Sequence, residues 1–323
     1  MKKLIIAVAL AAVFGLAGCN LGTSGFGTIT IPPAYSHGDR VVIGKGDLDM
    51  GEVRVGGHPQ TFYMGSPQGE DGRNDNEGPQ RLVTISAGFW ISETPVTQAQ
   101  WYYVMGSFTF ISQPPPTGGD SSVRRPMRSV NWFDTLVFAN RLSEREGFTP
   151  AYMINGSTNP DDWGDVPRNN AHPDLDAWNR VEIVPGSTGY RLPTEAQWEF
   201  AARAGTTTPF SDGVEVPTTE SLDRIGWFAF NGGVMTGREV GLKEPNPWGL
   251  YDIHGNVAEW VWDWFGAYPS HAQTDPAGAS WGNTRTFRSG HALSNPNAHR
   301  SAARGSADTL SGPDWMGFRL VRP

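Results

Sequence analysis

The residues that could carry chemistry in this chain first limit what it can do. The 323-residue sequence has one cysteine, Cys19, and seven histidines. A single thiol excludes an intrachain disulfide, a cysteine zinc site and any mechanism that needs two thiols. No two histidines are spaced i, i+4 on an expected helix, and none stands with a glutamate as H-x-x-x-E or H-E-x-x-H, which are typical metal-binding spacings. No Gly-x-Ser-x-Gly nucleophile elbow precedes an expected helix.

One histidine pair leaves two interpretations open. His291 and His299 lie close together near the C-terminus. They could share a metal ion, or they could be two independent surface residues, and the sequence favours the second interpretation because no carboxylate accompanies them at a metal-binding spacing.

The composition predicts a folded chain that is rich in turns. Gly and Pro together make up 65 residues, about a fifth of the chain where an eighth is usual, while 13 Trp and 16 Phe supply too much apolar bulk for disorder. The net charge is −8 without a basic cluster, so a nucleic-acid partner is not expected. Four lysines leave 21 arginines among the 25 basic residues. Because the planar guanidinium group forms fixed hydrogen bonds, we expect structural arginines that bind irregular backbone.

The N-terminal segment has the layout of a lipoprotein signal. Lys2 and Lys3 precede a 13-residue apolar run (4–16), and the small residues Ala17 and Gly18 precede Cys19, as in a bacterial lipobox. The run is too short for a permanent transmembrane helix. We therefore expect a signal peptide at 1–18 and a lipid on Cys19 that anchors the protein outside the cytoplasm, at the outer membrane and cell surface. The alternative is an ordinary signal peptide with a chance cysteine.

The remaining chain predicts a tether followed by one α+β domain. Residues 19–52 are interpreted as a lipid-anchored tether and edge strands, with a β-type patch at 41–43, and residues 53–323 as the domain. Short β-type runs occur at 83–85 and 89–91, and 151–190 resembles a long loop. Three helices are predicted from N-cap residues and from glycines just beyond their ends. The caps are Thr97, Asn131 and Thr194, and the glycines are Gly106, Gly147 and Gly205.

Several stretches in fixed order resemble the formylglycine-generating enzyme family, also called the sulfatase-modifying factor domain. They are FYMGS (62–66), DNEGP (75–79), ETPVT (93–97), RLPTEAQWEFAAR (191–203), WGLYDIHGNVAEW (248–260) and GFRL (317–320). The resemblance covers about residues 53–323. It implies an α+β fold, namely an elaborated C-type lectin fold with few helices and much ordered loop.

The resemblance also implies which residues an active oxidase of the family would need, and this sequence lacks them. Oxidase members of the family use a cysteine pair near the C-terminus to hold copper and to act on a substrate thiol. The matching stretch, RSGHALSNPNAHR (288–300), contains no sulfur. We therefore predict that the protein is not an enzyme and has no catalytic cofactor. The alternative hypothesis is a divergent metal-dependent oxidase of the same family.

A structural calcium ion is a further implication of the resemblance. Family members bind calcium at the stretch that matches residues 252–259. Here the carboxylates of Asp252 and Glu259 and the carbonyls of Gly255 and Val257 would supply hard oxygen ligands. The alternative is that both carboxylates only bind backbone in a tight turn.

The sequence departs from the family pattern mainly in two stretches, 289–299 and 305–315. The family usually reads RGGSW where this chain reads RSGHA, so Ala292 stands in the place of Trp. An intact frame with altered loops resembles the variable proteins of diversity-generating retroelements, which use this C-type lectin frame. We therefore predict a variable C-terminal region at about 286–318 that binds a macromolecular ligand, a protein or a glycan. The alternative is a family member whose loops drifted. The predicted ligand-binding residues are Ser289, His291, Ala292, Leu293, Ser294, Asn295, Asn297, Ala307, Asp308, Thr309, Leu310, Ser311, Asp314 and Trp315.

Overall fold

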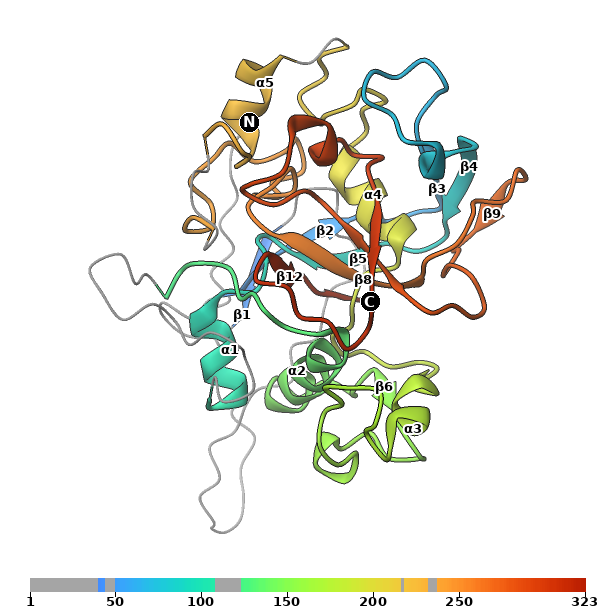
Figure 1. Cartoon of the computed structure of the whole chain (residues 1–323), viewed down its shortest axis with the longest axis vertical. Coiled ribbons are helices and arrows are strands. Elements are labelled where there is room, and N and C mark those ends of the chain that lie inside the picture. The colour runs from blue at the N-terminus through green and yellow to red at the C-terminus, as the bar shows by residue number, and fades with distance from the viewer. Residues whose placement is uncertain (1–39, 44–49, 108–122, 216–217, 232–236) are drawn as a thin grey trace, which may run out of the picture.

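The part of the chain that the structure describes begins at the predicted edge strand. The computed structural model describes residues 40–43, 50–107, 123–215, 218–231 and 237–323 (Figure 1). Cys19, the predicted signal peptide and most of the predicted tether lie outside the described residues. Within these ranges, no helix combines the length and the apolar character needed to cross a membrane.

Two four-stranded sheets form the centre of the fold. In the first sheet, with the order β1-β2-β5-β13, every pair is antiparallel, so the C-terminal strand lies next to strands from the first third of the chain. In the second, with the order β11-β10-β8-β12, β12 pairs with β8 in parallel and the other pairs are antiparallel. The strand bounds are β1 Arg40–Ile43, β2 Met50–Val55, β5 Phe89–Ser92, β13 Val321–Arg322, β8 Ala258–Trp264, β10 Arg285–Arg288, β11 Gly305–Ala307 and β12 Met316–Phe318.

Smaller sheets and short helices surround this centre, and the predicted α+β class is confirmed. The smaller strands are β3 Gln60–Met64, β4 Arg81–Ile85, β9 Gln273–Thr274, β6 Tyr152–Met153 and β7 Glu182–Ile183. The helices are α1 Gln98–Met105, α2 Trp132–Arg145, α3 Leu175–Asn179, α4 Glu195–Arg203 and α5 Thr219–Ile225, with 3-10 turns η2 Asp75–Glu77, η3 Pro160–Asp162 and η4 Pro296–His299.

The three helices predicted from their caps are present. Thr97, Asn131 and Thr194 are the N-cap residues of α1, α2 and α4, and each accepts a hydrogen bond from the backbone N–H three residues on. The predicted end of α4 is off by one residue, because Ala204 takes the left-handed cap conformation at φ 47°. The helices α3 and α5 were not predicted, because five and seven residues give too little periodicity to detect.

Strand β8 lies between the two main cores. Ala258 and Trp260 pack into the core that contains α2, while Val261 packs into the core that contains α4. This is the alternation expected of a strand that is buried on both faces. The indole N–H of Trp260 donates to the Val130 carbonyl at 3.0 Å, and that of Trp132 donates to the Val261 carbonyl at 2.9 Å. Helix α2 is thereby fixed to β8, and α4 lies on the other side of the strand (Figure 1).

Candidate functional site

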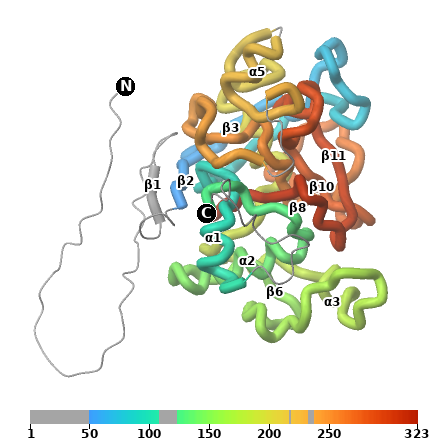
Figure 2. The backbone as a smooth tube through the Cα atoms, turned by 60° about the vertical axis from the view of Figure 1, so that its left-hand side comes forward, coloured from blue at the N-terminus to red at the C-terminus, as the bar shows by residue number. Residues whose placement is uncertain are grey.

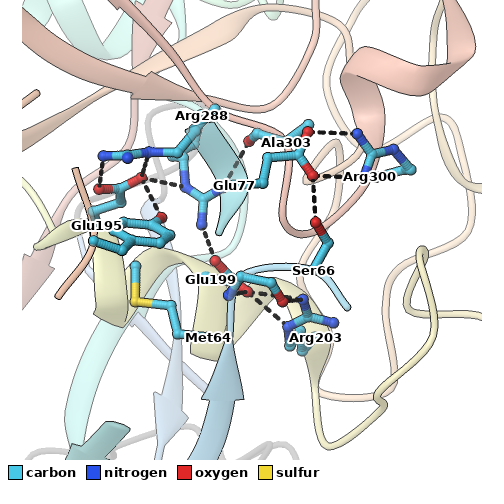
Figure 3. A network of polar contacts seen from close by, with 12 residues as sticks. Met64, Ser66, Glu77, Glu195, Glu199, Arg203, Arg288, Arg300 and Ala303 are labelled. Carbon is cyan, nitrogen blue, oxygen red and sulfur yellow. Dashed lines mark hydrogen bonds and ion pairs between the residues drawn. The ribbon is translucent and has the colours of Figure 1, made fainter. Parts of the chain in front are cut away.

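The first predicted binding loop (residues 289–299, the first loop) is preceded by a fully buried arginine. Arg288 forms an ion pair with Glu199 of α4 and donates to the Ala303 carbonyl at 2.6 Å (Figure 3). Glu199 also accepts from Arg203 at 2.9 Å and from the Gly65 N–H at 2.8 Å. One carboxylate therefore fixes the start of the first loop, the end of α4 and the end of β3 at the same point.

A second buried arginine follows the first loop. Arg300 donates to Glu77 at 2.6 and 2.8 Å, to Glu70 at 2.6 Å and to the Gly72 carbonyl at 2.7 Å. Ser66 donates its hydroxyl to Glu77 at 2.8 Å (Figure 3). Although burial raises the pKa of Glu77, the hydrogen bonds and charge of Arg300 lower it below the usual range. The first loop thus ends on a charged cluster that holds residues 66–77.

The second predicted binding loop (residues 305–315, the second loop) lies between two further arginines of this kind. Arg304 donates to both oxygens of Glu195 at 2.7 Å and to the Gly266 carbonyl at 2.8 Å. Beyond the loop, Arg319 donates to Glu259 at 2.7 and 2.8 Å and to the Tyr251 carbonyl at 3.0 Å. These contacts confirm the expectation of structural arginines that bind irregular backbone. We call the buried ion pairs of Arg288, Arg300, Arg304 and Arg319 the arginine network.

The start of the first loop is buried, which corrects two of the predicted ligand-binding residues. Ser289 has φ 62°, and its hydroxyl accepts from the Gly255 N–H at 2.9 Å. Ala292 is 2% exposed, and its N–H donates to the Asn256 carbonyl at 3.1 Å. Both residues face the frame and hold the loop on the 255–256 turn, so they do not belong to a binding surface.

The second loop is held on the first turn of α2, and this corrects a third predicted residue. Thr309 is buried, and its carbonyl accepts from the Trp132 N–H at 3.1 Å. The Asp314 carbonyl accepts from Arg128 at 3.0 Å. Leu310 is half-buried against the main core. Thr309 is therefore part of the support of the loop and not of its outer surface.

A stacked aromatic pair joins the two loops. The ring of His291 lies 5.0 Å from that of Trp315, with an interplanar angle of 17°, and Trp315 packs at 5.4 Å against Phe287 of β10. Burial lowers the pKa of His291, and the nearby Asp314 carboxylate acts in the opposite sense. Burial thus favours the neutral imidazole of His291 near neutral pH.

From this stack the two loops diverge. The first loop runs towards residues 66–77, where the Asn297 side chain packs on Gly72, and the second runs towards the start of α2 (Figure 1). We use the name loop surface for the predicted residues that remain exposed or half-exposed. These are Leu293, Asn295, Asn297 and Asp308, which are exposed, and His291, Ser294, Ala307, Leu310, Ser311, Asp314 and Trp315, which are half-exposed.

The structure adds an aromatic residue that the sequence analysis missed. Phe230 is 74% exposed, and the neighbouring Ala229 N–H donates to the Ser294 carbonyl of the first loop at 3.1 Å. The Phe228 ring packs edge-on against Phe230 at 6.0 Å and against His299 at 6.1 Å. Phe230 therefore lies on a segment that is hydrogen-bonded to the first loop, and it adds an exposed aromatic side chain near that loop. No spacing signal identifies it, because only the tertiary contact brings residue 229 to residue 294.

The two C-terminal histidines lie in different environments. His299 is fully buried, with Nδ1 3.0 Å from the Asn295 carbonyl oxygen, whereas His291 stacks on Trp315. Burial lowers the pKa of His299 to about 4, and it does the same to His254, whose Nδ1 lies 2.8 Å from the His299 carbonyl oxygen. In the described ranges, no group of three or more His, Cys, Asp or Glu side chains could hold a metal ion.

The predicted calcium ligands have protein partners in the structure. Glu259 is fully buried and accepts from Arg319 on both oxygens and from the Trp198 indole at 2.7 Å. Asp252 accepts from the Gly241 N–H at 2.8 Å and from the Asn256 amide at 3.2 Å, and burial raises its pKa to about 6. A Ca²⁺ ion would have to share Glu259 with a guanidinium group. Because Arg319 already occupies both oxygens of Glu259, this donor set does not fit a hard divalent cation well. Calcium at this stretch is a prediction from the resemblance that the structure does not test.

Comparisons with known proteins agree with the motifs and the fold. Residues 30–323 match the family model described as "Sulfatase-modifying factor enzyme 1-like domain". The solved structure of Treponema denticola variable protein 1 has a TM-score of 0.72 and 30% identity, covering 88% of this chain and 99% of that chain.

Two curated relatives match most or all of the chain. The chaperone protein LppX of Paenibacillus barcinonensis is 29% identical over 339 residues, which cover 100% of this chain and 99% of the relative. The formylglycine-generating enzyme of Thermomonospora curvata is 32% identical over 312 residues, which cover 85% and 94% of the two chains. With its motifs in family order and its loops held by buried arginines, the chain belongs to the family of sulfatase-modifying factor enzyme 1-like domains.

Proposed function

We propose that the protein is a lipid-anchored, extracytoplasmic binding protein whose loop surface binds a protein or glycan ligand and whose frame is not catalytic. One observation carries the proposal: the exposed side chains of both loops lie between buried arginines that bind carboxylates and carbonyls of the frame. Side chains on such loops can change without disturbing the support beneath them. The stack of His291 on Trp315 joins the two loops at one point.

The character of the loop surface favours macromolecular recognition. It combines the exposed apolar side chain of Leu293, and that of Phe230 on the adjoining segment, with amide and carboxylate groups on Asn295, Asn297 and Asp308. Apolar anchors surrounded by polar groups are typical of protein interfaces. The similarity to a structure named as a variable protein supports the same interpretation.

The position of the chain's only cysteine argues against a thiol-oxidising activity. Its formylglycine-generating relatives are named as enzymes, but Cys19 lies far from the first loop in sequence, and copper–thiolate chemistry needs sulfur. The competing function, a metal-dependent oxidase, predicts turnover of a cysteine-containing peptide that is lost in a His291→Ala/His299→Ala variant. Such turnover would refute the binding proposal.

The direct test is a ligand screen followed by substitutions. Full-length lipoprotein in nanodiscs is exposed to a glycan array and to a library of displayed extracellular proteins. We expect at least one ligand whose binding is lost in the Leu293→Ala/Asn295→Ala/Asn297→Ala/Asp308→Ala variant. The matched control is Trp281→Ala, because Trp281 is 77% exposed and lies outside both loops. Equal binding by the wild type and the loop variant would place the ligand elsewhere.

The flanking DNA tests the proposed variability independently. A downstream near-copy of the segment that encodes residues 286–318, differing only at adenines and adjacent to a reverse transcriptase gene, is the expected arrangement. A locus without such a copy would leave a binding protein with fixed loops and would remove diversification from the proposal.

A further inference from the structure

A cavity lies on the frame away from the loop surface. Its volume is about 410 Å³, and it lies between α1, α2 and the segment 160–172. This volume is within the range of small-molecule sites. On α2 the cavity is lined by Asp134, Val137 and Arg141, which are spaced i, i+3, i+7 and so lie on one face of the helix.

The inner wall of the cavity is apolar and held in place. Trp101, Met105, Val137 and Val166 are among the apolar residues that line the cavity. The Trp101 ring stacks on Phe138 at 5.4 Å with an interplanar angle of 7°, and its indole N–H donates to the Ser107 carbonyl at 3.0 Å. The Trp101 ring is therefore already fixed before a ligand binds, so binding of an apolar group does not require the free-energy cost of ordering this side chain.

Both guanidinium groups at the cavity already have carboxylate partners. Arg168 donates to the two oxygens of Asp134 at 2.6 and 2.7 Å. Arg141 donates to Asp161 at 2.7 Å. These pairs neutralise the positive charges of the lining, so an anionic ligand would find no uncompensated cation there.

One charge of the lining remains uncompensated, and it is negative. The Asp165 carboxylate is exposed at the cavity and forms no hydrogen bond or ion pair with any described residue. The remaining titratable group of the lining, His172, accepts from the Asp174 N–H at 3.2 Å through Nδ1. An apolar wall with one free carboxylate at its edge matches a ligand with an apolar body and a cationic end.

We propose that this cavity is a second binding site, carried by the frame, for a small aralkylammonium or alkylammonium ion. The apolar body lies against Trp101, Met105 and Val137, and the ammonium group faces Asp165. The site uses no residue of either loop and does not depend on the proposed loop function.

The test uses three probes of one shape: 2-phenylethylamine, 2-phenylethanol and 3-phenylpropionate. Isothermal titration of the full-length protein at neutral pH is expected to show the amine binding about three- to fivefold more tightly than the alcohol, and the carboxylate more weakly than both. Asp165→Asn should lower the affinity for the amine to that for the alcohol. Asp176→Asn, an exposed carboxylate on α3 outside the cavity, is the matched control and should change nothing.

A second variant locates the site. Val166→Trp places a large ring in the cavity from a half-buried loop position and should abolish binding of all three probes, with an unchanged circular dichroism spectrum as the check on folding. Absence of amine binding at millimolar concentration would overturn the proposal. It would also be overturned by equal affinity for the three probes, or by an amine affinity that Asp165→Asn leaves unchanged.

Discussion

At the scale of single residues, stability and function are divided between different side chains. Arg288 is fully buried and bound to Glu199, whereas Leu293, five residues on, is 41% exposed. Removal of one member of a buried ion pair leaves an uncompensated charge and is costly, while a change at an exposed position usually alters stability by less than about 0.5 kcal/mol. The sequence predicted that arginines would bind backbone. It could not identify Glu199 as a partner, because 89 residues separate the two in the chain.

Arg288→Met tests the buried pair directly. We expect a loss of about 3–5 kcal/mol in the free energy of unfolding, measured by urea titration, because Glu199 keeps only Arg203 as a guanidinium partner and the buried Ala303 carbonyl loses its donor. Arg124→Met is the control, since the ion pair of Arg124 with Glu239 is exposed at 3.9 Å, and it should cost less than about 1 kcal/mol. Equal losses in the two variants would show that the buried ion pair of Arg288 contributes no more to the stability of the fold than an exposed pair does.

The buried histidines predict a loss of stability in acid. Burial lowers the pKa of His254 and His299 to about 4, below the ordinary value of about 6.5 for an unfolded chain. The unfolded chain therefore binds more protons between about pH 4 and 6.5, so the free energy of unfolding falls as the pH falls through this window. Each histidine contributes at most about 3 kcal/mol. Asp252 and Asp263 act in the opposite sense, because burial raises their pKa values to about 6 and about 7. The loss ascribed to the histidines is therefore measured as a difference between variants.

His254→Gln separates these contributions. The variant should lose less free energy of unfolding between pH 7 and pH 5 than the wild type, because one group that must gain a proton on unfolding is gone. Urea titrations at the two pH values measure the difference. An identical pH dependence in the two proteins would show that His254 is not held neutral by burial.

At the scale of elements, α2 connects the two proposed sites. Its cap Asn131 donates to the Pro167 carbonyl at 2.8 Å, next to the cavity, while the following Trp132 N–H holds Thr309 of the second loop. The caps of α1, α2 and α4 could be predicted because a capping signal is local. The buried positions of Ser289, Ala292 and Thr309 could not, because they depend on backbone contacts with distant turns.

Asn131→Ala should therefore cost more than an ordinary cap. We expect about 2 kcal/mol of unfolding free energy, since both the cap and the bond to Pro167 are lost. Thr194→Ala, which removes a cap of α4 in a similar capping box, is the control and should cost about 1 kcal/mol. Thermal and urea unfolding measure both variants. A smaller loss for Asn131→Ala than for Thr194→Ala would contradict the role of α2 as a connector.

At the scale of the whole molecule, the first strand of the continuous described chain lies far from the C-terminal strands that support the loops. Strand β2, where the continuous described chain begins, lies on one side in Figure 2, and β10 and β11 lie on the opposite side. A tether that enters at β2 would leave the loop surface facing away from the membrane. This arrangement fits the proposed display of a ligand-binding surface.

The central claim is that the loop surface varies independently of the arginine network, and one measurement tests it most directly. It is the free energy of unfolding of the Leu293→Ala/Asn295→Ala/Asn297→Ala/Asp308→Ala variant, determined by urea titration beside the wild type. Four exposed positions predict a total loss below about 2 kcal/mol, with an unchanged dependence on urea concentration. A loss as large as that of Arg288→Met alone would make these side chains part of the frame and would contradict the account.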